Sequence, residues 1–200
     1  MVHLDHQQLA YLEQVPLYGL FLDLRKAFDA MDRERCLLIL EDRGVGPRIR
    51  LLIERFWALA LLVCKAGGYF GTAVKALRGV TQGGPLSPRI FNLMVDAVIR
   101  EWLRQVLGNR VAADGIGTQI RLLLAAFYAD NGLVQSRDPE FLQFSFDILV
   151  GLFERVGLRT NTTKTEAHVF KKANHYVEGE LEEFWVPGLD QSVVGVEGCQ

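Results

Sequence analysis

The chain has 200 residues, of which 50% are hydrophobic and 23% charged, a composition ordinary for a globular protein with one respectable core or two very small ones. It contains no run of 18 apolar residues, and its start lacks the basic and apolar regions of a signal peptide, so neither a membrane span nor secretion is expected. The net charge of −2 conceals an asymmetry along the chain. Residues 25–110 hold 15 Lys and Arg against 8 Asp and Glu, whereas residues 173–200 hold six acidic residues and no Lys or Arg. The basic middle could meet phosphates, but the whole chain lacks the positive balance of a self-sufficient nucleic-acid binder.

The first third of the chain predicts a strand followed by two helices. Residues 18–24 (YGLFLDL) are mostly apolar and end in a carboxylate, which predicts a buried strand. Asp32 is expected to cap a helix that Gly44 ends, and Pro47 is expected to open the next helix. The apolar face predicted for that second helix consists of Ile49, Leu52, Ile53, Phe56, Leu59 and Ala60.

The middle of the chain predicts a hairpin and a long helix. Residues 61–66 and 69–78 are expected to be strands joined by a Gly67–Gly68 turn. Ser87 is expected to cap a helix over residues 89–107, with a loop at 108–118 after it. The buried side predicted for this helix consists of Phe91, Met94, Val95, Val98, Trp102 and Val106.

The last third predicts a second hairpin, a helix and a final strand. Residues 119–128 and 133–136 are the expected hairpin strands, and Asp138 is expected to cap a helix that Gly157 ends. Residues 166–172 predict one more strand, and residues 173–200 show no clear period. The order of elements predicts an α+β domain with a largely antiparallel sheet and helices packed on one face.

Two carboxylates and a glycine-rich loop carry the candidate chemistry. Asp23 follows a buried strand, where a carboxylate is costly without a partner; a metal ion is one such partner, and service in a turn is the alternative. Asp130 lies at the tip of the predicted hairpin in FYADNG, and by pattern alone an Asn131–Gly132 turn explains this stretch better than a catalytic role does. The loop GVTQGGPLSP at 79–88 suits close approach to a ligand, although a loop with a helix cap would look the same.

Together these features predict nucleotidyl transfer. Two neighbouring carboxylates repel each other unless cations bridge them, and Mg²⁺ favours carboxylate oxygens together with substrate phosphates. Two ions roughly 3.5–4 Å apart can activate a 3′-hydroxyl and stabilise departing pyrophosphate.

Four stretches resemble the palm motifs of reverse transcriptases, in order and spacing: LDLRKAFDAMD, GVTQGGPLSPRIFNLMVDAV, FYADN and VGLRTNTTKTE. The similarity is greatest to the non-LTR (LINE-type) retrotransposon enzymes, whose usual forms are LDLxKAFD, GVxQGxPLSP, YADD and GLxxNxxKT. It covers about residues 16–171 and implies the palm subdomain of a right-hand polymerase, with RNA template, DNA primer and dNTP as partners and two Mg²⁺ ions, or Mn²⁺ in their place, as cofactors.

The resemblance also assigns roles to individual residues. Asp23, the carbonyl of Leu24 and Asp130 become metal ligands, and Lys164 matches the lysine that neutralises or protonates the leaving pyrophosphate; a solvated loop lysine is the alternative for Lys164. Phe28 resembles the steric gate that rejects a ribose 2′-hydroxyl. The remaining substrate-binding positions implied by the match are Gln82, Gly83, Tyr128 and Ala129.

The chain departs from the family at one catalytic position. Asn131 stands where the family has the second aspartate of YADD. An amide oxygen can still ligate a cation but carries no negative charge, so weak metal binding and severely reduced activity are expected.

The predicted organisation is a palm at residues 1–172, with fingers and thumb largely missing, followed by an acidic segment of uncertain structure at 173–200. A non-catalytic remnant or domesticated module that binds nucleic acid or protein is the alternative function, and another two-metal enzyme such as a cyclase is disfavoured because cyclases lack the QGGPLSP loop. Cys36, Cys64 and Cys199 are far apart and are read as reduced thiols, which predicts an intracellular location in nucleus or cytoplasm.

Overall fold

A computed structural model describes residues 17–81, 83–114 and 123–170, together with 183–184, 193–194 and 196–197. Its centre is a five-stranded sheet in the order β11-β8-β1-β7-β6. The strands are β1 (Leu17–Asp23), β6 (Leu123–Tyr128), β7 (Asn131–Ser136), β8 (Glu166–Phe170) and β11 (Val196–Glu197). Neighbouring strands are antiparallel except β11 and β8, which are parallel, so the expected largely antiparallel sheet is confirmed.

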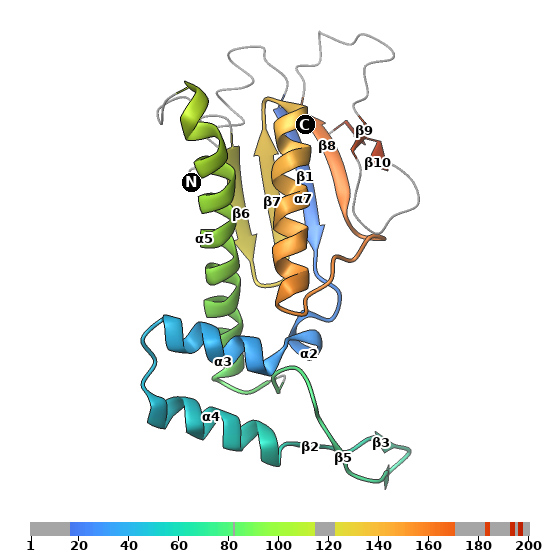
Figure 1. Ribbon diagram of the computed structural model, residues 1–200. Coiled ribbons are helices and arrows are strands. Elements are labelled where there is room, and N and C mark those ends of the chain that lie inside the picture. Colours follow the sequence, from blue (N-terminus) through green and yellow to red (C-terminus); the bar gives the residue numbers. More distant parts are fainter. Residues whose placement is uncertain are drawn as a thin grey trace.

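Two helices, α5 (Ser87–Asp114) and α7 (Pro139–Arg155), lie side by side across one face of the sheet (Figure 1). The predicted apolar side of α5 is confirmed, since all six of its residues are buried. The indole Nε1 of Trp102 donates a hydrogen bond to the Ser145 carbonyl at 2.6 Å and so ties the two helices together. This layer of helices on one face confirms the predicted α+β architecture.

The loop predicted at 108–118 is wrong for its first part, because α5 continues to Asp114. Gly108 lies inside this helix, where glycine costs about 1 kcal/mol relative to alanine, and the burial of the preceding turns outweighs that cost. Residues 115–118 lie outside the described part of the chain.

The predicted aspartate caps are confirmed. Asp32 precedes α3 (Arg33–Asp42) and accepts a hydrogen bond from the Arg35 N–H at 3.0 Å, and Asp138 accepts one from the Phe141 N–H before α7. Ser87 differs from its predicted capping role. It is the first residue of α5, and its hydroxyl donates to the Thr81 carbonyl at 2.6 Å.

Helix α4 (Pro47–Leu59) begins at the expected proline but packs by a narrower stripe than predicted. Only Ile53 and Trp57 are buried, whereas four other members of the predicted face are exposed: Ile49, Leu52, Phe56 and Leu59. The helix lies beyond the end of the sheet with α3 as its neighbour, so one line of side chains suffices for this contact (Figure 1).

The expected Gly67–Gly68 turn is present, with φ of 57° and 86°, but the strands around it are short. They are β2 (Leu61–Leu62), β3 (Lys65–Ala66), β4 (Tyr69–Phe70) and β5 (Val74–Lys75). They form two separate two-stranded ladders, β2–β5 and β3–β4, which project away from the main sheet (Figure 1).

Two further strands come from the region without a predicted element, β9 (Glu183–Phe184) and β10 (Val193–Val194), which pair with each other. Strand predictions at 119–122 and 171–172 fall outside the described residues. None of the helices in the described ranges combines the length and apolar character needed to span a bilayer.

Candidate functional site

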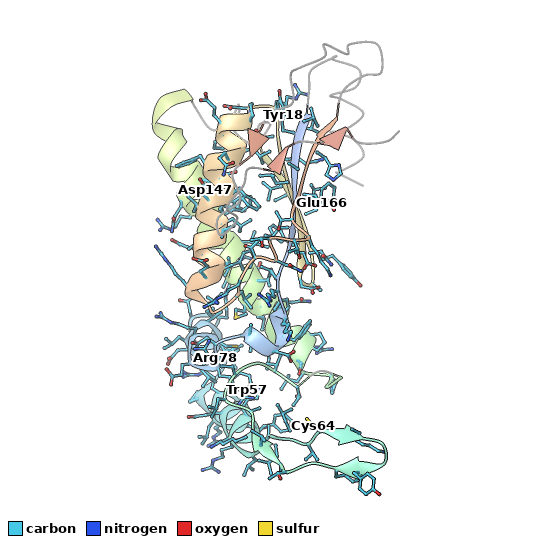
Figure 2. The ribbon with its side chains drawn as sticks, turned by 90° about the vertical axis from the view of Figure 1, so that its right-hand side faces the viewer. Tyr18, Trp57, Cys64, Arg78, Asp147 and Glu166 are labelled. Carbon is cyan, nitrogen blue, oxygen red and sulfur yellow. The ribbon has the colours of Figure 1, made fainter. Side chains whose placement is uncertain are left out.

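The candidate site lies on the face of the sheet that carries no helix. Leu20 and Leu22 of β1 are buried beneath α5 and α7, so the alternation of the strand turns Phe21 and Asp23 to the opposite face. Figure 2 shows Glu166 of β8 on the side of the sheet facing away from the helix that carries Asp147. Side chains on this face can therefore meet a ligand from solvent.

Antiparallel pairing brings Asp23 next to the hairpin that carries Asp130. Asp23, the last residue of β1, lies directly opposite Asn131, the first residue of β7. The N–H of Leu24 donates to the Asp130 carbonyl at 3.0 Å, which fixes the hairpin tip against the end of β1. Residues more than 100 positions apart in sequence thus converge on the end of two adjacent strands.

The hairpin turn differs from the expected Asn131–Gly132 turn. Tyr128 pairs with Asn131 across the hairpin, so the two loop residues are Ala129 and Asp130, and the positive φ of 53° belongs to Ala129. Gly132 lies within β7 opposite Phe127, and a Cβ there would come within 2.6 Å of the Phe127 ring. Gly132 therefore leaves space for the Phe127 ring and does not form the turn.

Asn161 holds the carboxylate of Asp23, a role that sequence reasoning missed. Its side-chain Nδ2 donates to Asp23 Oδ2 at 2.7 Å, and its backbone N–H donates to the Asp23 carbonyl at 2.7 Å. The Asn161 carbonyl in turn accepts backbone N–H bonds from Lys164 and Thr165, both at 3.0 Å. The signal that could have identified it is its place in VGLRTNTTKTE, at the asparagine of GLxxNxxKT.

Lys164 completes the group around Asp23. Its Nζ lies 4.0 Å from Asp23 Oδ1, and its side chain is 68% exposed while that of Asp23 is 18% exposed. Both residues and Asn131 line an open cleft of about 570 Å³. The other residues of this cleft are Phe21, Leu22, Gly132, Thr163, Glu166 and His168.

The glycine-rich loop is joined to the segment after β1, beside the short helix α2 (Ala27–Ala30). The Val80 N–H donates to the Phe28 carbonyl at 2.8 Å, and the Phe28 ring stacks on Phe91 with 4.6 Å between centroids. A Cβ on Gly79 would lie 2.6 Å from the Asp29 Cα, so only glycine permits this approach. The loop and α2 are therefore one packed unit.

Other predicted substrate-binding residues lie outside the cleft around Asp23. Leu24 is buried, Tyr128 is 85% exposed at the hairpin, and Gly83 is exposed with a φ of 83°. Gln82 falls outside the described residues. Asp130 adjoins Leu24 through its backbone and is not among the residues lining the cleft.

Backbone strain is concentrated beside this site. Within the described ranges, Lys26 and Ala129 are the non-glycine residues with positive φ, at 48° and 53°. One follows Asp23 by three positions and the other directly precedes Asp130. Such conformations cost of order 1–3 kcal/mol each, and they cluster at active sites and ligand clamps. Their placement favours a functional role for the two aspartates.

Two of the four residues expected to ligate a cation lie in the cleft. Asp23 Oδ2 is hydrogen-bonded to Asn161, while the charged group near Oδ1 is Lys164 at 4.0 Å. Asp23 and Asn131 line the cleft and carry the oxygen ligands that Mg²⁺ prefers, whereas Leu24 and Asp130 are not among its lining residues. In the described part of the chain, no three or more His, Cys, Asp or Glu side chains form a group that could hold a metal ion.

Comparisons with known proteins agree on one family. The family model described as reverse transcriptase (RNA-dependent DNA polymerase) matches residues 3–188. The Pol polyprotein from type-1 retrotransposable element R2 of Nasonia vitripennis is 31% identical over 145 residues, or 71% of this chain, and that from type-2 element R2DM of Drosophila melanogaster is 27% identical over 143 residues, or 72%. The match spans 13% of the length of each of these relatives.

Solved structures show the same fold at low identity. Telomerase from Candida tropicalis in complex with a fragment of telomeric RNA superposes with a TM-score of 0.64 at 12% identity, over 84% of this chain and 28% of that one. Telomerase from Candida albicans gives a TM-score of 0.62 at 16% identity, over 82% of this chain and 30% of that one. These likenesses bear on the fold alone.

Proposed function

The chain belongs to the reverse transcriptase family, of the non-LTR retrotransposon kind, and from that premise we propose that it is the palm of an RNA-directed DNA polymerase. Its partners would be an RNA template, a DNA primer and dNTPs. The observation that carries the proposal is the meeting of Asp23 with the Asp130–Asn131 pair at the open ends of β1 and β7. The palm would occupy residues 1–172, and β11 of the acidic segment 173–200 adds an edge strand to its sheet.

Asp23, Asp130 and the carbonyl of Leu24 would hold divalent cations, Mg²⁺ or Mn²⁺, which supply activation of a primer 3′-hydroxyl and stabilisation of the leaving pyrophosphate. Asn161 holds one oxygen of Asp23 and leaves the other for ligation. Lys164 is on the same cleft and brings a positive charge to the departing phosphates. Gln82, Gly83, Tyr128 and Ala129 would contact the nucleotide and primer.

Phe28 would act as a steric gate for the sugar. Its ring is backed by Phe91, and its carbonyl is bonded to Val80 of the glycine-rich loop. A ring braced in this way cannot easily yield to an extra ribose oxygen, which supports a preference for deoxynucleotides.

Asn131 would reduce the activity of this site. At an effective dielectric of ~20, one unit charge at ~4 Å contributes about 4 kcal/mol before desolvation. A change of ~1.4 kcal/mol in barrier already alters a rate tenfold. Two ions held by Asp23 and Asp130 alone would therefore bind weakly, and extension would be slow.

The test is primer extension on an RNA template with Mg²⁺ or Mn²⁺, comparing the chain with its Asn131→Asp variant. We expect at least a tenfold faster extension by the variant and a lower Mn²⁺ concentration for half-maximal rate. Asn92→Asp is the matched control, because it adds the same charge at an exposed position of α5. Adding Asp23→Asn to Asn131→Asp should abolish the gain.

A binding module without catalysis is the second candidate, and the neutral amide of Asn131 favours it. Absence of extension in both forms, with RNA binding retained, would support that module and contradict the polymerase proposal. In either case we place the protein inside the cell, in nucleus or cytoplasm, where the free thiols Cys36 and Cys64 stay reduced.

A further inference from the structure

A second cleft, of about 530 Å³, lies outside the candidate site and is lined by arginines from four parts of the chain. We call it the arginine cleft. Its arginines are Arg35 of α3, Arg78 of the segment before α5, Arg155 in the last turn of α7, and Arg159 of the segment leading to β8.

The arginine cleft has an excess of positive charge. Four guanidinium groups face two carboxylates, Asp32 and Glu154, and Asp32 already accepts the N–H of Arg35 as the cap of α3. All four arginines are exposed, and none forms an ion pair with a described acidic residue within 4.0 Å. Other arginines are paired at 2.6–3.0 Å: Arg43 and Arg100 with Asp96, Arg50 with Glu41, and Arg104 with Glu101.

Backbone hydrogen bonds join the segments that line the arginine cleft. The Arg25 N–H donates to the Arg159 carbonyl at 2.8 Å, and the Asp32 N–H donates to the Val156 carbonyl at 3.2 Å. The Gly79 N–H, next to Arg78, donates to the Met31 carbonyl at 2.9 Å. These bonds join three arginine-bearing segments to residues 25–32, so the guanidinium groups can gather around a ligand without refolding of the main chain.

Gly157 shows how closely these segments pack. Its φ is 83°, and a Cβ there would lie 3.2 Å from both the Ala30 carbonyl oxygen and the Asp32 Cβ. The end of α7 therefore rests directly on the segment that joins α2 to α3. This contact places the chain between Arg155 and Arg159 next to the segment that leads to Arg35.

We propose that the arginine cleft binds a phosphate group. Planar guanidinium groups match phosphate oxygens through paired, charge-assisted hydrogen bonds, and an anion offsets the repulsion among clustered arginines. The phosphate would come from a nucleic-acid backbone or from a free nucleoside triphosphate. This proposal does not use Asp23, Asp130 or Asn131, so it can hold even if the polymerase proposal fails.

The experiment measures binding and not catalysis. Arg35→Gln combined with Arg159→Gln removes two charges from the arginine cleft, and Arg100→Gln combined with Arg104→Gln removes two paired charges from α5 as the control. The probes are a labelled single-stranded RNA and deoxythymidine triphosphate, each titrated over a series of salt concentrations.

The two sources of phosphate give different results. If the ligand is a nucleic-acid backbone, the cleft variant should bind RNA at least fivefold more weakly, and its salt dependence should fall by roughly 0.7 log units per log unit of salt for each phosphate that the variant no longer neutralises. If the ligand is a free nucleotide, the triphosphate should lose affinity while RNA binding stays unchanged. Equal affinities of the cleft and control variants for both probes would overturn the proposal. Arg78→Gln, at an exposed position, provides a second variant if the double substitution fails to fold.

Discussion

At the scale of single residues, Asn161 is the side chain on which the geometry of Asp23 depends. It donates two hydrogen bonds to Asp23, one from its side chain and one from its backbone, both at 2.7 Å. The side-chain bond goes to a carboxyl group that is 18% exposed, and hydrogen bonds to charged groups contribute about 1.5–3 kcal/mol. Removing this bond should therefore lower both the stability of the fold and the affinity of the site for a ligand.

We predict that Asn161→Ala lowers the free energy of unfolding by about 1–3 kcal/mol, because the largely buried carboxyl group of Asp23 loses a hydrogen-bond donor. Urea denaturation with an unchanged m value measures this loss. Thr162→Ala is the matched control in the same turn, and it should change stability by less than about 0.5 kcal/mol. Equal effects of the two substitutions would show that the turn, and not the bond to Asp23, determines stability.

The motif residues were predictable from sequence, but their supports were not. Asp23 stood out because a carboxylate that follows a buried strand is costly without a partner, and Asp130 stood out through the match of FYADN to the family motif. The bond from Asn161 joins residues 138 positions apart, and no local pattern reveals such a pairing. The turn was misplaced for a related reason: pairing with both Asp23 and Tyr128 draws Asn131 into β7, although Asn-Gly favours a turn in isolation.

At the scale of elements, α4 shows where periodicity stops being informative. The sequence correctly places a helix with apolar residues at helical spacing, but periodicity does not say how much of the face finds a neighbour. The structure buries Ile53 and Trp57 and leaves Phe56 56% exposed. Trp57 gains further support from Arg33, whose Nη1 donates to the Trp57 carbonyl at 3.1 Å and whose guanidinium carbon lies 5.6 Å from the ring centroid.

Adjacent aromatic residues of α4 should therefore differ sharply when truncated. Trp57→Ala is expected to cost about 3–5 kcal/mol, because a buried indole is removed from its packing. Phe56→Ala should stay within about 0.5 kcal/mol, since its ring is already largely in water. Chemical denaturation of both variants checks the prediction. Comparable losses at the two positions would mean that the exposed side of α4 is covered in solution.

At the scale of the whole molecule, the described chain divides into regions of unequal burial. Strand β1 lies between β7 and β8 beneath the two long helices, and Leu20 and Val134 are fully buried. In contrast, every residue from 61 to 75 is exposed, and the ladders there are two residues long. Short exposed ladders bury little apolar surface, so their hydrogen bonds can open without unfolding the sheet.

Native-state hydrogen exchange should reveal this division. Amides of β1 and β7 should exchange only through global unfolding, with an opening free energy equal to the free energy of unfolding. Amides of residues 61–75 should exchange through local openings that cost less than about 2 kcal/mol. Mass spectrometry of peptic peptides at several denaturant concentrations distinguishes the two, because only global opening depends strongly on denaturant. Trp57→Ala supplies a control, since destabilisation that spreads through the core accelerates β1 exchange, while destabilisation confined to α4 leaves it unchanged. Slow exchange at residues 61–75 in the free protein would contradict the division and would mean that these ladders share the cooperativity of the sheet.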